Sequence, residues 1–278
     1  MFANGRQQQM KIMVAVKQVP ERDAQIVVRA DGRWIDESDL SYIVNEPDAY
    51  ALEEALQLKE ALHQAGHAGI EVIAVCAGPE RAASTLRDAL AKGADRAIHI
   101  RADDLAERDT LALAGLLADA VRAESPDLIL TGLQSDDLGM GQTGVVLAEL
   151  LQISHATLVL RVRVLHDEAN PAVLPKRIEV KRELEDGWFQ QIEMPLPALL
   201  TIQSGGNKLR YATLMGIKKA KSKETRIIAA AAAIVPTTIA PERVYLPEKQ
   251  KHTEMLKGTA AEIAAQIVDK LKFEVRVL

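Results

Sequence analysis

The sequence predicts an α/β protein in which a mostly parallel sheet carries helices on both faces. Short runs that are apolar throughout, such as residues 70–78, alternate over the first 150 residues with longer segments whose apolar residues recur at helical spacing. Such runs are typical of strands buried on both faces, and their alternation with helices favours right-handed parallel crossovers. After His155 apolar and polar residues alternate one by one, which predicts an antiparallel extension of the sheet.

The elements follow from this pattern in chain order. A polar excursion at 22–40, with a turn signal at Asp31-Gly32, separates the first strand from the first helix. Strands are predicted at 11–18, 70–78, 96–100, 127–134, 156–165, 177–184, 188–195, 198–205 and 273–278. Helices are predicted at 45–66, 79–93, 110–124, 143–152 and 259–271.

Three regions are expected along the 278 residues. Residues 1–10 are interpreted as a loose lead-in without a function. Residues 11–205 form the α/β domain, which length alone allows to be one large domain. Residues 206–278 contain long connections and few apolar residues, so they bury little by themselves and are expected to form an arm that packs on a partner.

The composition excludes several classes of protein. Thirty-four basic residues against 39 acidic ones give a net charge of −5, and aromatic residues make up 3%, which disfavours a broadly basic or base-stacking nucleic-acid binder. The lysines at 218–223 are therefore interpreted as a solvated helix face. A single cysteine, Cys76, cannot form an internal disulfide, so a reducing compartment, the cytoplasm, is expected. The longest apolar run, 227–235, is too short to span a bilayer.

The most specific local feature is the segment 131–148, TGLQSDDLGMGQTGVVLA, in which a strand runs into a glycine-bearing loop and then into a helix. Gly139 and Gly141 allow close approach to a ligand, Thr143 can cap the helix, and the free N–H groups of Gly144 and Val145 suit an anion such as a nucleotide phosphate. Taken alone, the segment also fits a flexible loop before an ordinary capped helix.

The same loop formally matches the G-x-G-x-x-G fingerprint through Gly139, Gly141 and Gly144. In dinucleotide-binding dehydrogenases those glycines directly follow the first strand, and an acidic residue lies about 20 positions further on. Here four residues intervene after a late strand, and the region about 20 residues on is basic. A nicotinamide-dependent dehydrogenase is therefore excluded.

Other candidate residues follow strand ends or begin helices. Asn45 and Asp48 are either caps of the first helix or ligand contacts. The carboxylates of Asp136 and Asp137 could likewise bind either backbone N–H groups of the chain or the ribose hydroxyls of a ligand. Cys76 ends the second long strand on the side where ligands gather, although a small buried thiol is the simpler interpretation.

No catalytic or metal-binding constellation is recognisable. His63 and His67 stand four residues apart, but no glutamate lies between them and no third ligand is evident, so no metal site is predicted. No Ser/His/Asp set has a recognisable context. The sequence indicates a carrier or binding protein without catalytic residues of its own.

The joint pattern resembles the β subunits of electron transfer flavoproteins. The matching pieces run in collinear order from about residue 11 to residue 223: KIMVAVKQV, NEPDAYALEEALQLKE, VIAVCAGPERAASTLRDALAKGADRAIHI, TGLQSDDLGMGQTGVVLAELL, VKRELEDG and LRYATLMGIKKAK. The resemblance implies a Rossmann-like, adenine-nucleotide-binding domain and a heterodimer with a larger α subunit that holds most of the FAD. The β subunit itself would carry AMP or, in bifurcating members, a second FAD.

The resemblance also implies which residues contact the nucleotide. These are residues at the carboxyl ends of the predicted strands and in the glycine-bearing loop: Ala15, Asn45, Glu46, Pro47, Asp48, Ala77, Asp137, Gly139, Gly141, Gln142, Thr143, Gly144 and Val145.

A second set of residues is implied for docking. Leu214 with Ile217, Lys219 and Lys221 resembles the loop through which the family contacts partner dehydrogenases, such as acyl-CoA dehydrogenases of fatty acid β-oxidation, before electrons pass to a quinone-linked acceptor. Glu183 matches a carboxylate that contacts the mobile FAD domain. Without the resemblance, Leu214 is simply a core residue of a short helix.

Two other classes of function remain open from the residues alone. One is a stand-alone ATP-binding sensor or hydrolase of the same α/β superfamily, and the other is a non-redox interaction module. The sequence also departs from some family members, because Glu21-Arg22-Asp23 stands where they have an aromatic residue near the flavin, so stacking of this chain on the flavin is not expected.

Overall fold

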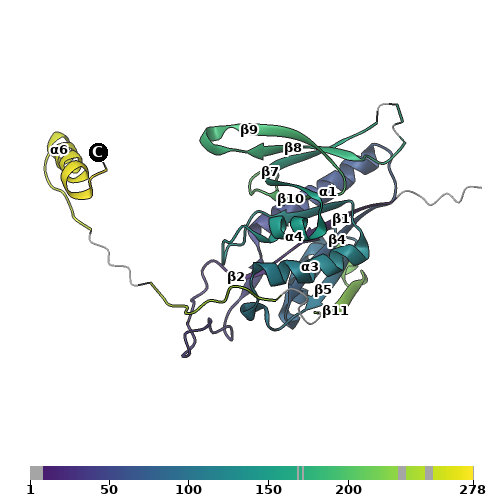
Figure 1. Ribbon diagram of the computed structural model, residues 1–278, viewed down its shortest axis with the longest axis horizontal. Coiled ribbons are helices and arrows are strands. Elements are labelled where there is room, and N and C mark those ends of the chain that lie inside the picture. The colour runs from purple at the N-terminus through teal and green to yellow at the C-terminus, as the bar shows by residue number, and fades with distance from the viewer. Residues whose placement is uncertain (1–8, 168, 171, 231–235, 248–252, 278) are drawn as a thin grey trace, which may run out of the picture. The chain divides into compact units, whose positions relative to one another are not determined.

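The computed structural model describes residues 9–167, 169–170, 172–230, 236–247 and 253–277 (Figure 1). The chain divides into two compact units, Met1–Arg243 and Val244–Leu278. In the described parts of the chain, the first unit holds the sheet and most of the helices, and the second holds one helix and its extension.

A nine-stranded sheet in the order β11-β5-β4-β1-β6-β10-β7-β8-β9 forms the frame of the first unit. From β11 to β7 all neighbouring strands are parallel, and β7-β8-β9 are antiparallel. The strands of this sheet are β1 (Met10–Ala15), β4 (Ile70–Gly78), β5 (Arg96–Arg101), β6 (Leu128–Gly132), β7 (Ser154–Leu165), β8 (Arg177–Glu183), β9 (Phe189–Pro195), β10 (Ala198–Ile202) and β11 (Thr225–Ala229). The predicted mostly parallel α/β fold with an antiparallel extension is confirmed.

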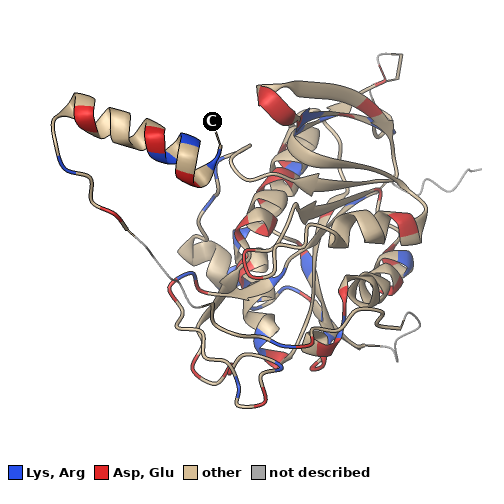
Figure 2. Cartoon of the chain, turned by 60° about the vertical axis from the view of Figure 1, so that its left-hand side comes forward, with Lys and Arg blue, Asp and Glu red and all other residues tan. Residues whose placement is uncertain are grey.

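Helices cover both faces because successive strand residues point to opposite sides. Ile12 and Val14 of β1 pack in one core with α1 (Glu46–Gln64) and α2 (Ala83–Lys92), whereas Met13 packs in the other core with α3 (Thr110–Glu124) and α4 (Thr143–Leu151). Strands that supply both cores must be apolar at every position, which explains the continuous runs in the sequence. In Figure 2 charged residues lie mainly on helices and loops, and the central strands are largely uncharged.

One strand of the expected antiparallel extension belongs elsewhere. β10 lies between β6 and β7 and is parallel to both, so residues 198–202 of the predicted strand 198–205 complete the buried centre of the sheet. All five residues of β10 are buried. This burial on both faces accounts for its continuous apolar run, ALLTI, which the alternating strands 156–195 before it do not have.

The polar excursion at 22–40 forms the expected hairpin-like turn. Val28 and Ile35 pair as an antiparallel bridge, and Gly32 turns the chain with a φ of 64°. A small two-stranded sheet, β2 (Gln18–Pro20) with β3 (Tyr42–Val44), joins the ends of the excursion. The predicted first strand therefore divides into β1 and β2.

Residues 206–243 belong to the first unit and do not form the separate arm that the sequence predicts. α5 (Leu214–Ala220) contacts α2, and β11 pairs with β5 at the edge of the sheet. The boundary between the units thus falls after Arg243, later than the expected one at 205. At the other end, Met10 already belongs to β1, whereas residues 1–8 of the expected lead-in lie outside the described residues.

The second unit contains α6 (Ala260–Asp269), which continues into the π-helical turn η4 (Lys270–Val275). The side chain of Thr259 and that of Glu262 form a capping box at the start of α6. The predicted final strand at 273–278 is wrong, because residues 270–275 extend the helix instead. No helix in the described part of the chain is both long enough and apolar enough to cross a membrane.

Candidate functional site

The carboxyl ends of β1, β4 and β6 meet at one edge of the sheet. β1 pairs with β4 on one side and with β6 on the other, so the chain leaves neighbouring strands in opposite directions there. In open parallel sheets the crevice at such a switch point is where ligands bind. The residues implied as nucleotide contacts all lie at these strand ends, at the start of α1, in the loop between β6 and α4 or in the first turn of α4.

The start of α1 is tied to this edge by two buried side chains. The Asp48 carboxylate accepts hydrogen bonds from the backbone N–H of Lys17 at 2.7 Å and of Gly132 at 2.8 Å. Asn45 donates from Nδ2 to the carbonyl oxygen of Gln134 and accepts through Oδ1 from the N–H of Asp136. Neither side chain caps α1, so the alternative of simple helix caps is wrong. Asn45 instead fixes the loop after β6, and Asp48 holds Lys17 and the end of β6.

Burial raises the pKa of Asp48 to about 6, even though the two backbone N–H groups favour its charged form. Gly132 makes this close approach possible. A Cβ on Gly132 would lie 2.7 Å from the Cβ of Pro47 and 2.8 Å from the backbone nitrogen of Asp48. The helix start and the strand end are therefore packed backbone against backbone.

The loop itself is held by an ion pair. Lys17 Nζ lies 2.6 Å from Asp137 Oδ1 and also donates to Ser135 Oγ. Burial raises the pKa of Asp137, but the Lys17 ammonium and the hydrogen bonds outweigh it and leave that pKa below its ordinary value. Asp136 accepts from the backbone N–H of Glu46 at 3.4 Å, which links the loop once more to the start of α1.

Two glycines of the loop adopt the left-handed conformation. Gly139 has a φ of 62° and Gly141 a φ of 64°, and neither has a neighbour closer than 3.8 Å to the position of an added Cβ. The loop backbone is thus open on this side, as a ligand cradle requires. Leu138 and Met140 beside them are more than half exposed.

The first N–H groups of the helix after the loop are unpaired. The prediction that Thr143 caps this helix is wrong. Thr143 is the first residue of α4, the N-cap position is Gln142, and no side chain caps the helix. The first backbone bond along the helix is donated by Val146, so Thr143, Gly144 and Val145 have no intrahelical acceptor.

Gly144 has a second role that the sequence did not indicate. A Cβ there would lie 2.6 Å from Thr201 Cγ2 and 2.7 Å from Thr131 Oγ1. The glycine therefore lets α4 approach β6 and β10, in addition to any approach of a ligand.

Small side chains line the neighbouring strand ends. Ala15 and Ala77 are half-buried and contact the core under α3 and α4. Cys76 is fully buried, and burial raises the pKa of its thiol to about 12, so it behaves as a small apolar residue. Within the described ranges, no group of three or more His, Cys, Asp or Glu side chains is arranged to hold a metal ion.

The two histidines considered for a metal are not paired with each other. The ring of His67 stacks near that of His166, with Nε2 and Nδ1 3.3 Å apart. Two pockets also lie away from the carboxyl ends of the strands. One of about 270 Å³ is formed by the ends of α3 and α4 and the beginnings of β6 and β10, and the other, of about 10 Å³, lies beside α1.

The implied docking residues lie on α5 or, for Lys221, directly after it, far along the chain from the loop. Leu214 is 83% exposed, and Ile217, Lys219 and Lys221 are also exposed. The interpretation of Leu214 as a core residue is therefore wrong. Lys223 differs from the other lysines of the stretch, because its Nζ donates to the carbonyl oxygens of Leu90 and Ala94 at the end of α2.

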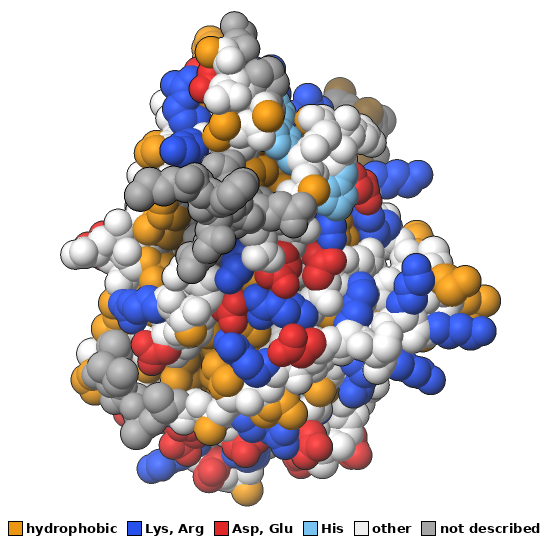
Figure 3. Space-filling model, turned by 90° about the vertical axis from the view of Figure 1, so that its right-hand side faces the viewer, with side chains coloured by type: hydrophobic (Ala, Val, Ile, Leu, Met, Phe, Trp, Pro, Cys, Tyr) orange, Lys and Arg blue, Asp and Glu red, His pale blue; other side chains and the backbone are white. Residues whose placement is uncertain are grey.

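Glu183 ends β8 and is half-buried. Gln203, just after β10, donates to its carboxylate at 3.4 Å. In the middle of the face shown in Figure 3 acidic and basic side chains intermingle, whereas basic side chains predominate toward the right-hand side.

Several residues that organise these surfaces were not found from the sequence. The sequence places Lys17 in a predicted strand and Glu53 and Glu54 in a predicted helix, and assigns none of them a role. The sequence does contain a signal for the buried glutamates. Glu53 and Glu54 are adjacent on a helix and are flanked by the apolar residues Leu52 and Ala55, which places at least one of the two carboxylates toward the core.

A parallel sheet with a glycine-bearing loop at its switch point defines a Rossmann-like α/β protein. Comparison with known proteins narrows this class. The family model described as "Electron transfer flavoprotein domain" matches residues 33–233. The chain is 37% identical to the electron transfer flavoprotein subunit beta of Methylophilus methylotrophus, over 93% of this chain and 97% of that protein.

Other relatives agree. The subunit beta of Bacillus subtilis is 34% identical over 97% of this chain and all of that protein, and the mitochondrial subunit beta of Oryza sativa subsp. indica is 35% identical over the same shares. The chain belongs to the electron transfer flavoprotein family and has the character of its β subunits.

Proposed function

We propose that this chain pairs with an electron transfer flavoprotein α subunit and binds an adenine nucleotide at the carboxyl edge of its sheet. The observation that carries the proposal is the combination of the open backbone at Gly139 and Gly141 with the unpaired N–H groups at the start of α4. Backbone N–H groups at a helix start favour a phosphate through hydrogen bonds and the helix dipole. The small residues Ala15 and Ala77 leave room beside the loop.

The remaining implied contacts act mainly by holding this arrangement. Asn45 and Asp48 use their side chains on the loop and on the ends of β1 and β6, so they position the site rather than recognise a ligand. Lys17 contacts the loop through its ammonium group and offsets the charge of Asp137. Gln142 is exposed at the entrance to α4.

The nucleotide is proposed to be AMP, with a second FAD as the alternative, since both present an adenylate phosphate to the same loop. The redox-active FAD would be held mostly by the α subunit and would supply the electron transfer. The residues of this chain would bind, orient and dock. A cytoplasmic setting is proposed from the single, buried cysteine.

The exposed apolar residues of α5, with lysines close behind, fit a docking surface for a partner with an acidic rim around an apolar pocket. Acyl-CoA dehydrogenases are the proposed donors, and a quinone-linked oxidoreductase the proposed acceptor. Glu183 is proposed to contact the FAD domain of the α subunit.

A charge change at the start of α4 tests the nucleotide site. Thr143→Glu places a carboxylate where the phosphate would lie and also favours the helix, whereas Thr143→Gln has the same size without the charge. After co-expression with the α subunit, the purified complex is denatured and the released adenine compounds are identified. Beyond the FAD held by the α subunit, we expect about one adenine nucleotide per complex for the wild type and Thr143→Gln, and less than about a tenth of that for Thr143→Glu.

Other results would contradict the proposal. A complex without flavin absorbance and without any adenine compound would overturn it. A chain that stays without an α subunit and binds ATP with Mg²⁺ would instead support the stand-alone sensor or hydrolase.

A further inference from the structure

The segment that leads into α5 is anchored to α1 by an unusual set of buried acidic groups. Two adjacent carboxylates, Glu53 and Glu54, lie in the middle of α1 with side chains about 5% exposed. Each carboxylate accepts hydrogen bonds from the segment 207–210, which is more than 150 residues away in the sequence.

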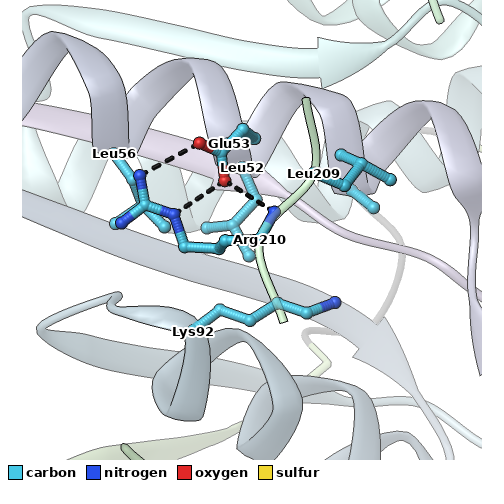
Figure 4. A pocket seen from close by; sticks show the side chains of 7 residues that line it. Leu52, Glu53, Leu56, Lys92, Leu209 and Arg210 are labelled. Carbon is cyan, nitrogen blue, oxygen red and sulfur yellow. Dashed lines mark hydrogen bonds and ion pairs between the residues drawn. The ribbon is translucent and has the colours of Figure 1, made fainter. Parts of the chain in front are cut away.

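Arg210 makes the stronger of these contacts (Figure 4). Its Nε donates to Glu53 Oε2 at 2.7 Å and its Nη2 to Oε1 at 3.0 Å, and its backbone N–H also points to Oε2. Nη1 reaches Glu60, about two turns further along α1, at 2.7 Å. A two-pronged guanidinium–carboxylate contact fixes orientation as well as distance.

The protonation of the pair follows from this geometry. Burial raises the pKa of Glu53, but the charge and hydrogen bonds of Arg210, together with a hydrogen bond from Gln57, outweigh it and leave that pKa below its ordinary value. Burial likewise raises the pKa of Glu54, which has no guanidinium partner and stays above its ordinary value. Arg210 therefore keeps an otherwise unfavourable buried charge in place.

Close backbone contacts secure both ends of the segment. A Cβ on Gly206 would lie 3.0 Å from the carbonyl carbon of Leu160 in β7, and one on Gly216 would run into the carbonyl oxygen of Ala91 in α2. Asn207 Nδ2 donates to Glu54 and to the carbonyl oxygen of Tyr50. The segment 206–216 is thus held at β7, at two points on α1 and at α2.

The residues that this segment presents are apolar and uncovered within the unit. Tyr211 is 91% exposed and Leu214 83%, with Met215 63% and Ile217 46% exposed. An apolar patch of this kind on a free loop would lose conformational entropy when it docks, whereas a fixed patch would not.

We propose that Arg210 is a positioning residue for partner docking, which acts through Glu53 to hold the patch of Tyr211, Leu214, Met215 and Ile217 ready for the partner. This inference rests on the proposed docking function of α5. Arg210 itself is directed into α1 and need not touch the partner.

The test uses the flavin-loaded complex of this chain with its α subunit and a donor dehydrogenase. Arg210→Gln should raise the KM for the donor about tenfold with an almost unchanged kcat, because the docked complex is the same once formed. Arg210→Lys should recover part of the affinity. Hydrogen exchange of the amides of residues 211–217 should become faster in Arg210→Gln.

A coupling measurement separates positioning from a general loss of structure. Leu214→Ala should raise the KM by a smaller factor in the Arg210→Gln background than in the wild type, since a loosened patch already docks poorly. Arg163→Gln is the matched control, because Arg163 forms an exposed pair with Glu179 elsewhere in the unit, and it should leave the KM unchanged.

If Arg210→Gln destabilises the complex through the unpaired Glu53, the double variant Glu53→Gln with Arg210→Gln removes both charges and should show the same rise in KM. An unchanged KM and unchanged exchange in either variant would overturn the inference, while an effect of Leu214→Ala alone would leave the docking function standing. No effect of Leu214→Ala in the wild type would overturn the docking function itself.

Discussion

At the scale of residues, three carboxylates on one helix show how environment decides charge. Asp48, Glu53 and Glu54 are all buried in α1, yet the pKa of Asp48 rises to about 6 and that of Glu54 also rises, whereas that of Glu53 falls. Only Glu53 faces a guanidinium at hydrogen-bond distance. Backbone N–H groups and amides offset part of the desolvation, and a full opposite charge offsets all of it.

The raised pKa of Asp48 predicts a pH dependence of stability. Because the carboxyl group protonates more readily in the folded protein than in the unfolded chain, with its ordinary value of 3.8, the folded protein holds more protons between pH 4 and 6. The free energy of unfolding should therefore fall as pH rises through this window, by up to about 3 kcal/mol from this group. Below pH 4 the carboxyl group is protonated in both the folded and the unfolded state, so Asp48 no longer lowers the free energy of unfolding.

Asp48→Asn should remove that dependence. Urea unfolding from pH 4 to pH 7 should show the stability of the wild type decreasing relative to the variant by about 3 kcal/mol. Asp39→Asn, at an exposed site in the same unit, controls for the loss of a carboxylate. A difference that stays constant over this range would contradict the assigned role of Asp48.

At the scale of elements, helices approach the strands closely only where a glycine leaves no Cβ to clash with its neighbours. Gly132 lets the start of α1 meet the end of β6, and Gly144 lets α4 meet β6 and β10. Both contacts bring a helix start to the carboxyl edge of the sheet. The candidate nucleotide site is thus a consequence of how closely these helices pack.

Gly144→Ala should be destabilising by about 1–3 kcal/mol, since the added methyl group would overlap Thr131 and Thr201. This outcome opposes the gain that alanine normally brings to a helix. Glu149→Ala, at an exposed position of the same helix, should change stability by less than about 0.5 kcal/mol. Equal midpoints of urea unfolding for the two variants would show that α4 does not pack as described.

At the scale of the whole molecule, the two units differ in how they bury apolar surface. The first unit has a core on each face of its sheet. α6 in the second unit contributes no buried residue, and Ile267, Val268 and Phe273 are exposed. A helix with an uncovered apolar face gains little stability by itself, so the second unit is expected to pack on the α subunit.

A chain that ends at Arg243 should therefore keep its fold but lose its partner. We expect its circular dichroism spectrum and urea midpoint to stay close to those of the full chain, because both cores are intact. Copurification with a tagged α subunit should fall at least about tenfold. Full copurification would show that the first unit alone holds the α subunit.

The sequence by itself determined the order and type of most elements in the first unit, since a strand buried on both faces must be apolar throughout and a helix at the surface must repeat its apolar residues. It also located the loop at 139–144, because glycine spacing is local. Only the tertiary structure decided that β10 lies inside the parallel sheet, that Leu214 is exposed and that residues 270–275 continue a helix. It alone paired Arg210 with Glu53 and Asp48 with Gly132. These depend on neighbours distant in the chain, and local patterns carry no information about which distant groups will compensate a buried charge or cover an apolar face.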